Sequence, residues 1–142
     1  MATTLATRDP RLEDIGKLGL RLVVGVLLLF HGFDKVHHGI AGIAEELGRV
    51  GLPRVMAYGV FVGELFAPIL ILLGVWTRPA ALVSAATILF ATLLVHARDY
   101  TRLAPTGGWA AELHVFYVLS ALAVAFLGAG RYSLRGGRGR FD

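Results

Sequence analysis

The sequence lacks cysteine and has few charged residues. None of its 142 residues is Cys, and charged residues make up 17%. Without a thiol, this chain cannot carry out disulfide exchange or provide thiolate metal ligands. It also has no flavin or nicotinamide motif and no internal repeat. Electrons for any redox reaction must then come from a partner, a bound cofactor or the substrate. The five histidines show no HxxxH spacing, so we expect neither haem nor a metal ion.

Apolar residues are in excess instead. Hydrophobic residues make up 56% of the chain and the mean hydropathy is +0.66. A soluble domain of this length has too little interior to bury so much apolar surface. The net charge of +4 is also typical of nucleic-acid-binding proteins, but most arginines here flank apolar runs, which is the pattern of membrane topology. We therefore predict an integral membrane protein that lies in a lipid bilayer and binds no nucleic acid.

Four apolar runs can cross a hydrocarbon core of about 30 Å. They cover about residues 15–33, 55–76, 79–96 and 109–128. None shows the two-residue alternation of barrel strands. The predicted fold is all-α, a four-helix membrane bundle formed by residues 1–130, followed by a basic, disordered tail of residues 131–142. No small-residue cleavage site follows the first run, so we expect that run to stay as an anchor.

The first outer loop contains a further helical pattern. In "IAGIAEELGRV", residues 40–50, apolar side chains recur at helical spacing. We predict a short amphipathic helix that lies in the membrane interface or folds back over the bundle. Gly51 and Pro53 would end it.

The distribution of basic residues predicts the orientation. With the N-terminus inside, the cytoplasmic side holds nine of the 14 Lys and Arg residues: Arg8, Arg11, Lys17, Arg21, Arg78, Arg131, Arg135, Arg138 and Arg140. The outer side holds the other five, which are Lys35, Arg49, Arg54, Arg98 and Arg102. Because positive charge favours the cytoplasmic side, we expect both termini there.

Glu64 lies about halfway along the second run. A charged side chain at that depth costs about 3 kcal/mol, and intramembrane acids often mark functional sites. Pro68, four residues on, has no N–H to donate to the Glu64 carbonyl. Two interpretations remain open: a group that exchanges protons in a site, or a protonated or paired residue that only holds helices together.

Polar residues of the other runs fall at a similar depth, in the outer half. His31 and Lys35 share one face of the first run, and His96 closes the third. Glu112 and His114 begin the fourth run, but they are about 200° apart around a helix, so only one can point inward. We expect these groups to converge above the buried glutamate, with His31 or Lys35 paired to an acid, Glu112 or Glu64.

The predicted site has two groups of residues. The catalytic candidates are Glu64, His31, Lys35 and His96. The cofactor-binding candidates are Arg21, Glu112 and His114; the Arg21 side chain would also extend to the headgroups. Lys35 could instead be an interface anchor and His96 a loop-boundary residue, while His37 and His38 are expected in the solvated loop.

The sequence resembles the DoxX/DoxD-like family of small bacterial membrane proteins over nearly its whole length. The similar segments are "RLVVGVLLLFHGFDKV", "GLP", "GELFAPILILLGVWTRPAAL", "LLVH" and "AELHVFYVLSALAVAFLGAGRYSL". The resemblance points to Arg21, His31, Gly32, Lys35, Glu64, Gly74, Arg78, His96, Glu112, Gly130, Arg131 and Ser133. An acid usually follows the last motif in the family, whereas this chain has Arg135.

The resemblance implies a four-helix protein of the bacterial inner membrane that is linked to quinone-dependent redox chemistry. Family members include a subunit of thiosulfate:quinone oxidoreductase and components of membrane complexes that handle oxidative stress. The implied cofactor is a quinone, and the implied partners are a redox protein or further copies of the chain.

Three functions follow as hypotheses. The first is a quinone-interacting redox subunit with a polar quinone or proton-exchange site in the outer half of the bundle. The second is a non-enzymatic anchor or assembly subunit for a redox partner. The third is a small transporter or proton conduit, since an intramembrane carboxylate is equally expected there.

Overall fold

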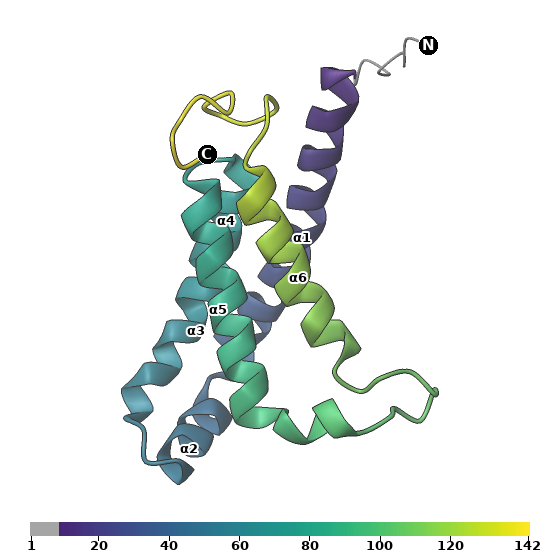
Figure 1. Ribbon diagram of the computed structural model, residues 1–142. Coiled ribbons are helices and arrows are strands. Elements are labelled where there is room, and N and C mark those ends of the chain that lie inside the picture. Colours follow the sequence, from purple (N-terminus) through teal and green to yellow (C-terminus); the bar gives the residue numbers. More distant parts are fainter. Residues whose placement is uncertain (1–8) are drawn as a thin grey trace.

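The computed structural model describes residues 9–142, and within this range the chain is helical and forms no sheet. Arg8, one of the basic residues assigned to the cytoplasmic side, lies outside the described residues. Four long helical segments run back and forth along one axis, as predicted (Figure 1). They are α1 (Pro10–His38), a composite segment over Arg54–Leu73, α5 (Thr77–Val95) and α6 (Glu112–Leu127). The all-α membrane bundle is confirmed.

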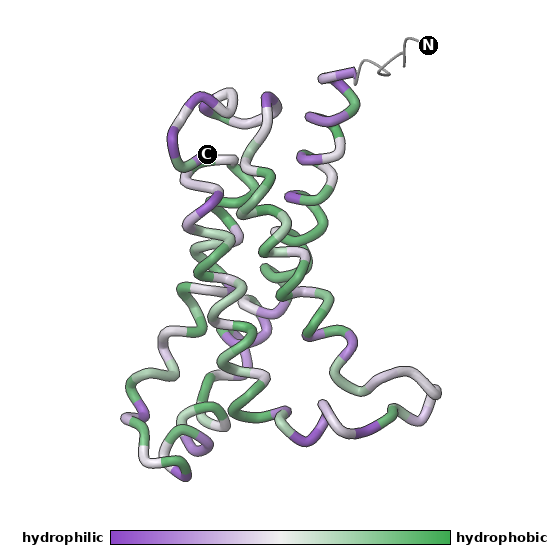
Figure 2. Tube along the Cα trace, viewed as in Figure 1, coloured by the Kyte–Doolittle hydropathy of each residue, from purple (hydrophilic) through white to green (hydrophobic). Residues whose placement is uncertain are grey.

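Length and composition suit these segments to a bilayer. The first three are long and apolar enough to cross a membrane, whereas α6 is a shorter apolar helix of 16 residues. Hydrophobic residues follow the middle of the bundle and hydrophilic ones gather at its two ends (Figure 2). Large side chains such as Phe30, Phe66 and Phe126 are 60–74% exposed on the outer surface. In a bilayer this surface faces the lipid chains.

The first helix is longer than predicted at both ends. It begins at an Asp9 cap, whose side chain accepts from the N–H of Arg11 at 2.9 Å, with Pro10 in the first turn. It ends only at Gly39, which has a φ of 84°. The expectation that His37 and His38 lie in a loop is therefore wrong. They belong to the last turn of α1, where a basic side chain interacts favourably with the helix dipole.

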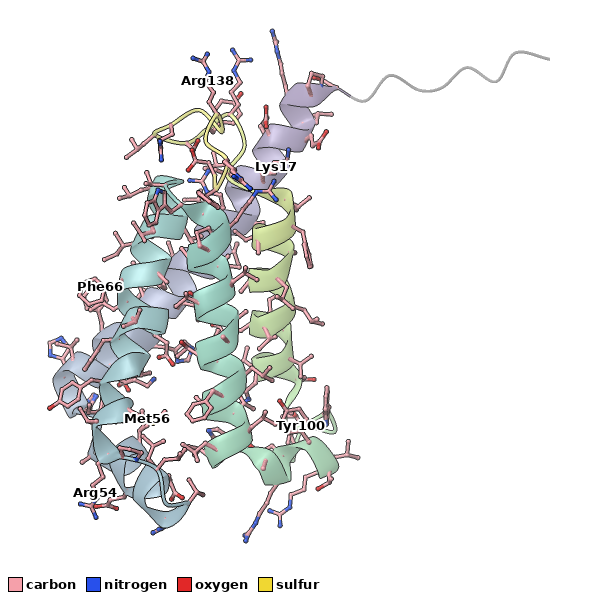
Figure 3. All side chains as sticks on the ribbon, turned by 60° about the vertical axis from the view of Figure 1, so that its left-hand side comes forward. Lys17, Arg54, Met56, Phe66, Tyr100 and Arg138 are labelled. Carbon is pink, nitrogen blue, oxygen red and sulfur yellow. The ribbon has the colours of Figure 1, made fainter. Side chains whose placement is uncertain are left out.

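The predicted amphipathic helix is α2 (Ala41–Arg49). It lies at the end of the bundle away from the C-terminus (Figure 1) and packs against α5 and the 3-10 turn η1 (Arg54–Tyr58). Leu47 is only 1% exposed and anchors α2 there. Lys17 and Arg138 project at one end of the molecule, while Arg54 and Tyr100 lie toward the other (Figure 3).

The composite second segment changes its helical type three times. It comprises the 3-10 turn η1 (Arg54–Tyr58), α3 (Gly59–Phe61), the π-helical turn η2 (Val62–Phe66) and α4 (Ala67–Leu73). In η2 the N–H of Ala67 bonds to the carbonyl of Val62 rather than to that of Gly63. The carbonyl of Gly63 would accept from Ala67 in an α-helix and from residue 68 in a π-helix. Ala67 is already bonded to Val62 and Pro68 has no N–H, so no backbone donor remains for this carbonyl. The Ser84 hydroxyl of α5 takes that place at 2.8 Å.

Arg21 closes the end of the bundle that carries the C-terminus. It is 1% exposed. Its guanidinium donates to the carbonyls of Ile71, Leu72, Ala129 and Tyr132 over 2.7–2.9 Å. The first two carbonyls lie in the last turn of α4, where a helix leaves acceptors unpaired, and the other two follow the end of α6. The expectation that Arg21 extends to the headgroups is wrong, because its donors are consumed inside the protein.

The C-terminal segment differs from the expected disordered tail. The N–H of Leu134 donates to the Leu73 carbonyl at 3.0 Å. Asp142 is 5% exposed and accepts from the N–H of Trp76 at 3.0 Å. Its backbone carbonyl accepts from Arg78 Nε at 3.1 Å. The segment folds back because the tight turn between α4 and α5 leaves backbone donors that a carboxylate can satisfy.

Candidate functional site

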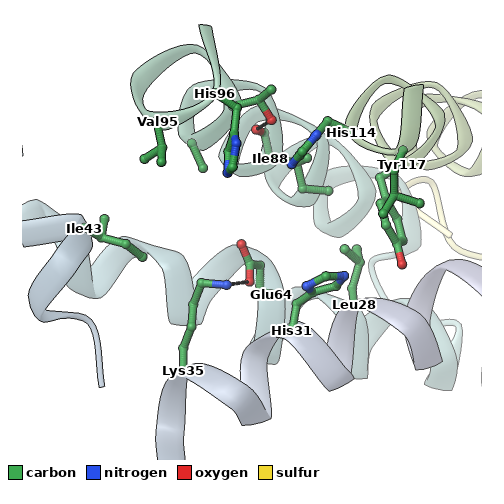
Figure 4. Close-up of a pocket in the computed structure, with 13 residues that line it drawn as sticks. Leu28, His31, Lys35, Ile43, Glu64, Ile88, Val95, His96, His114 and Tyr117 are labelled. Carbon is green, nitrogen blue, oxygen red and sulfur yellow. Dashed lines mark hydrogen bonds and ion pairs between the residues drawn. The ribbon is translucent and has the colours of Figure 1, made fainter. Parts of the chain in front are cut away.

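A cavity of about 310 Å³ opens in the half of the bundle away from Arg21. Side chains of α1, η2, α5 and α6 line it, and α2 contributes Ile43 (Figure 4). The apolar part of its wall includes Leu28, Ile88 and Val95. The polar groups are few and converge on this space, which is the usual composition of a small-molecule site.

The first pair of polar groups comes from α1 and η2. Lys35 Nζ lies 2.6 Å from Glu64 Oε2, and the two side chains are 21% and 8% exposed. The predicted pairing of a basic residue in α1 with an acid is confirmed, and the acid is Glu64. The pair forms part of the cavity wall (Figure 4). Each charge is compensated by the other in a place where an isolated charge would be costly.

The π turn and a glycine bring these two residues together. Gly32 of α1 lies against the backbone carbonyl of Glu64, and a Cβ atom at Gly32 would collide with it. Because Gly32 has no side chain, α1 can come close to η2 at this point, which is one helical turn before Lys35. Gly63 packs in the same way against Thr87 of α5.

The second polar group is a pair of histidines. His96, at the end of α5, and His114, in the first turns of α6, have ring centroids 4.6 Å apart. His96 Nδ1 lies 2.9 Å from the Asp99 carboxylate, which orients the ring and leaves Nε2 available. His114 Nδ1 is buried and has no hydrogen-bond partner within residues 9–142. A buried polar atom without a partner is uncommon and fits a group that binds a ligand.

His31 and Tyr117 form the remaining polar wall. Their rings are perpendicular, with centroids 5.5 Å apart. Tyr117 is 8% exposed and lies one helical turn after His114 on the same face of α6. Sequence reasoning missed Tyr117 and Asp99. The three-residue spacings from His114 to Tyr117 and from His96 to Asp99 are the signals that could have found them.

Two predicted site residues lie outside the cavity. Arg21 is at the opposite end of the bundle, with its donors on backbone carbonyls, so it does not line this cavity. Glu112 is exposed and its carboxylate lies over Gly108. Of the two residues of which only one could point inward, His114 faces the cavity and Glu112 does not.

The cavity holds donors, acceptors and an ion pair, but no metal-type cluster. Within residues 9–142, no group of three or more His, Asp or Glu side chains is placed to hold a metal ion. The available chemistry is hydrogen bonding to a polar ring and proton exchange through imidazole, carboxylate or ammonium groups.

Comparison with known proteins identifies the family of this chain. The DoxX family model matches residues 16–97, more than half of the chain. The chain belongs to the DoxX family. The matched range of the DoxX chain contains Lys35, Glu64 and His96, while His114 and Tyr117 lie beyond it.

Relatives extend the DoxX match through most of the chain. "Putative oxidoreductase CatD" of Bacillus subtilis is 31% identical over 116 residues, which cover 82% of this chain and 81% of the relative. An uncharacterized protein of Haemophilus influenzae is 30% identical over 115 residues, 81% of this chain and 84% of the relative. "Inner membrane protein YqjF" of Escherichia coli is 33% identical over 86 residues, 61% of this chain and 65% of the relative. No solved structure matches.

Proposed function

We propose that the cavity binds the head of a membrane quinone and that the protein is a membrane subunit for quinone-linked redox chemistry. The observation that carries the proposal is the Lys35–Glu64 pair within an apolar cavity that three histidines and a tyrosine also border. A quinone ring presents two carbonyl oxygens, which need donors, and its reduction requires protons as well as electrons.

The residues of the cavity fit these requirements. His96, His114 and Tyr117 supply hydrogen-bonding groups that this part of the chain leaves available to a ligand. Lys35 and Glu64 form a pair that can exchange a proton across 2.6 Å. The oxidoreductase in the name of the Bacillus subtilis relative supports the redox class only. Electrons would come from a partner, a bound cofactor or the substrate, because the chain has no thiol or nucleotide motif.

The proposal includes an orientation. The basic residues near both ends of the chain support cytoplasmic termini, and the name of the Escherichia coli relative supports a location in the inner membrane. The cavity would then open in the outer half of the bilayer, on the side of α2.

The test is binding of a chain-free benzoquinone to the purified protein, measured by calorimetric titration. We expect His114→Phe to weaken binding about tenfold, since one hydrogen bond is worth about 1–1.5 kcal/mol. The matched control is His38→Phe, because His38 is an exposed histidine of α1 outside the cavity. It should leave the affinity unchanged.

Two results would contradict the proposal: no quinone binding by the unaltered protein, or equal affinity in the His114→Phe variant. A folded protein that binds no quinone but purifies with a stable partner would favour the anchor or assembly function instead.

A further inference from the structure

A second, largely apolar groove adjoins the cavity. It lies between α2, the start of the composite segment and α5, and its volume is about 300 Å³. Its wall includes Leu47, Val60 and Phe90; only Thr87 carries a hydroxyl and no lining residue is charged. Ile43 and Ala91 line both the groove and the cavity, so the two spaces share a boundary.

The size of the cavity limits what it can hold. At about 310 Å³ it is at the lower end of small-molecule sites, which measure about 300–1,000 Å³. One substituted ring fits such a volume, but a long hydrocarbon chain attached to that ring does not. The chain of a membrane quinone must therefore leave the cavity, either into the bilayer or along the protein.

The composition of the walls favours one direction. On the side of α1 and α6, the polar side chains of His31, His114 and Tyr117 border the cavity. Toward α2 the boundary consists of Ile43 and Ala91, and beyond it the wall is apolar. A hydrocarbon chain makes its dispersion contacts with such a wall and leaves no polar group unpaired.

We infer that this groove is the binding site for the hydrocarbon chain of the ligand whose head occupies the cavity. The inference rests on the proposed function. The protein would thus bind a ring and its chain in two adjoining sites, with α2 as the outer wall of the chain site. A chain held there restricts the rotation of the ring and favours one orientation toward the Lys35–Glu64 pair.

Gly59 offers a way to fill the groove without disturbing the fold. It borders the groove, and a Cβ atom added there would meet no atom within 4 Å. Its φ of −59° is in the helical region, so a larger residue adopts it without strain. Gly19 of α1 has the same open surroundings and lines neither site, because it lies beside Arg21 toward the opposite end of the bundle.

The experiment compares two probes on the full chain in lipid nanodiscs: a chain-free benzoquinone and the same ring with a ten-carbon chain. Gly59→Phe should weaken binding of the chain-bearing probe about tenfold, because the added ring would occupy the volume that the chain fills. Its affinity for the chain-free probe should not change. Gly19→Phe should change neither, and Ala86→Phe, at a second groove position, should reproduce the selective loss.

The outcomes separate the groove from the proposed function. Unchanged affinity for both probes in Gly59→Phe would mean that the chain enters the bilayer, which overturns this inference and leaves the quinone-head site standing. Equal weakening of both probes would also overturn it, because only a selective loss indicates a chain site. If the unaltered protein binds neither probe, the proposed function fails and the groove inference fails with it.

Discussion

Arg21 and Lys35 are both basic side chains of α1, and their surroundings differ. Arg21 donates to four backbone carbonyls and does not line the candidate cavity. Such a guanidinium joins the ends of α4 and α6, so its role is structural. Lys35 donates to a carboxylate at the edge of a cavity. A charge paired in that way remains able to exchange protons with a ligand.

At the residue scale we predict that two substitutions of Glu64 have different effects. Glu64→Gln keeps the side-chain volume and an acceptor for Lys35, so the unfolding midpoint in detergent should change little. It should lower quinone-coupled turnover in membrane vesicles about 10²-fold, as loss of a general acid–base group does. Glu64→Leu should destabilise the bundle by about 3 kcal/mol, because it leaves the partly buried Lys35 with neither a counter-charge nor a hydrogen-bond acceptor.

The Leu variant has a matched control. In Glu64→Leu/Lys35→Met no uncompensated charge remains, so most of the lost stability should return. Full turnover in a well-folded Glu64→Gln protein would remove this carboxylate from the mechanism and leave it a structural role.

At the scale of elements, the contact between α1 and η2 determines the geometry of the site. The π turn and Pro68 leave the carbonyl of Gly63 without a backbone donor. Ser84 satisfies the carbonyl of Gly63, and Gly32 packs against the carbonyl of Glu64. A π turn inside an α-helix often occurs at a functional site. Here it lies at the residue that pairs with Lys35, which is consistent with that tendency.

We predict that alanine substitutions of three glycines in α1 change the free energy of unfolding by different amounts, in a fixed order. Gly32→Ala should destabilise the protein by about 1–3 kcal/mol, because its Cβ would meet the rigid backbone of Glu64. Gly25→Ala should cost less, because its closest neighbour is the flexible Leu72 side chain. Gly19→Ala should be neutral or stabilising by up to about 1 kcal/mol, since alanine favours the helix.

The unfolding midpoint in detergent measures this order. Binding of the chain-free quinone to the folded variants adds an independent readout, since only Gly32→Ala should weaken it. Equal midpoints for Gly32→Ala and Gly19→Ala would mean that α1 and η2 do not approach each other as closely as the structure has them.

At the scale of the whole molecule, the testable property is orientation in the membrane. The start of α1 and the C-terminal segment lie at one end of the bundle, and α2 lies at the other (Figure 1). Because the chain has no cysteine, single-cysteine variants report on one position each. We expect an impermeant maleimide to label Glu45→Cys in intact cells and to label Arg138→Cys only after the membrane is opened.

Both positions are exposed, so a difference in labelling reports on the side of the membrane rather than on burial. Labelling of Arg138→Cys from outside would reverse the orientation and place the cavity in the cytoplasmic half.

The sequence by itself determined the membrane bundle, the family and most of the element boundaries. These depend on local properties, namely apolar length, capping residues and turn residues. The helix over 41–49 and the pairing of a basic residue in the first run with an acid were also predictable. A buried charge needs a partner, and few acids lie at that depth.

Only the tertiary structure decided which polar residues meet. The sequence could not distinguish His114 from Glu112, because the rotation of a helix about its axis depends on what it packs against. It placed Arg21 at the headgroups, whereas the carbonyls that hold this side chain come from segments about 50 and 110 positions away. The π turn, the neighbouring groove and the folded C-terminal segment likewise depend on contacts between distant segments, and a sequence pattern within one helix does not encode such contacts.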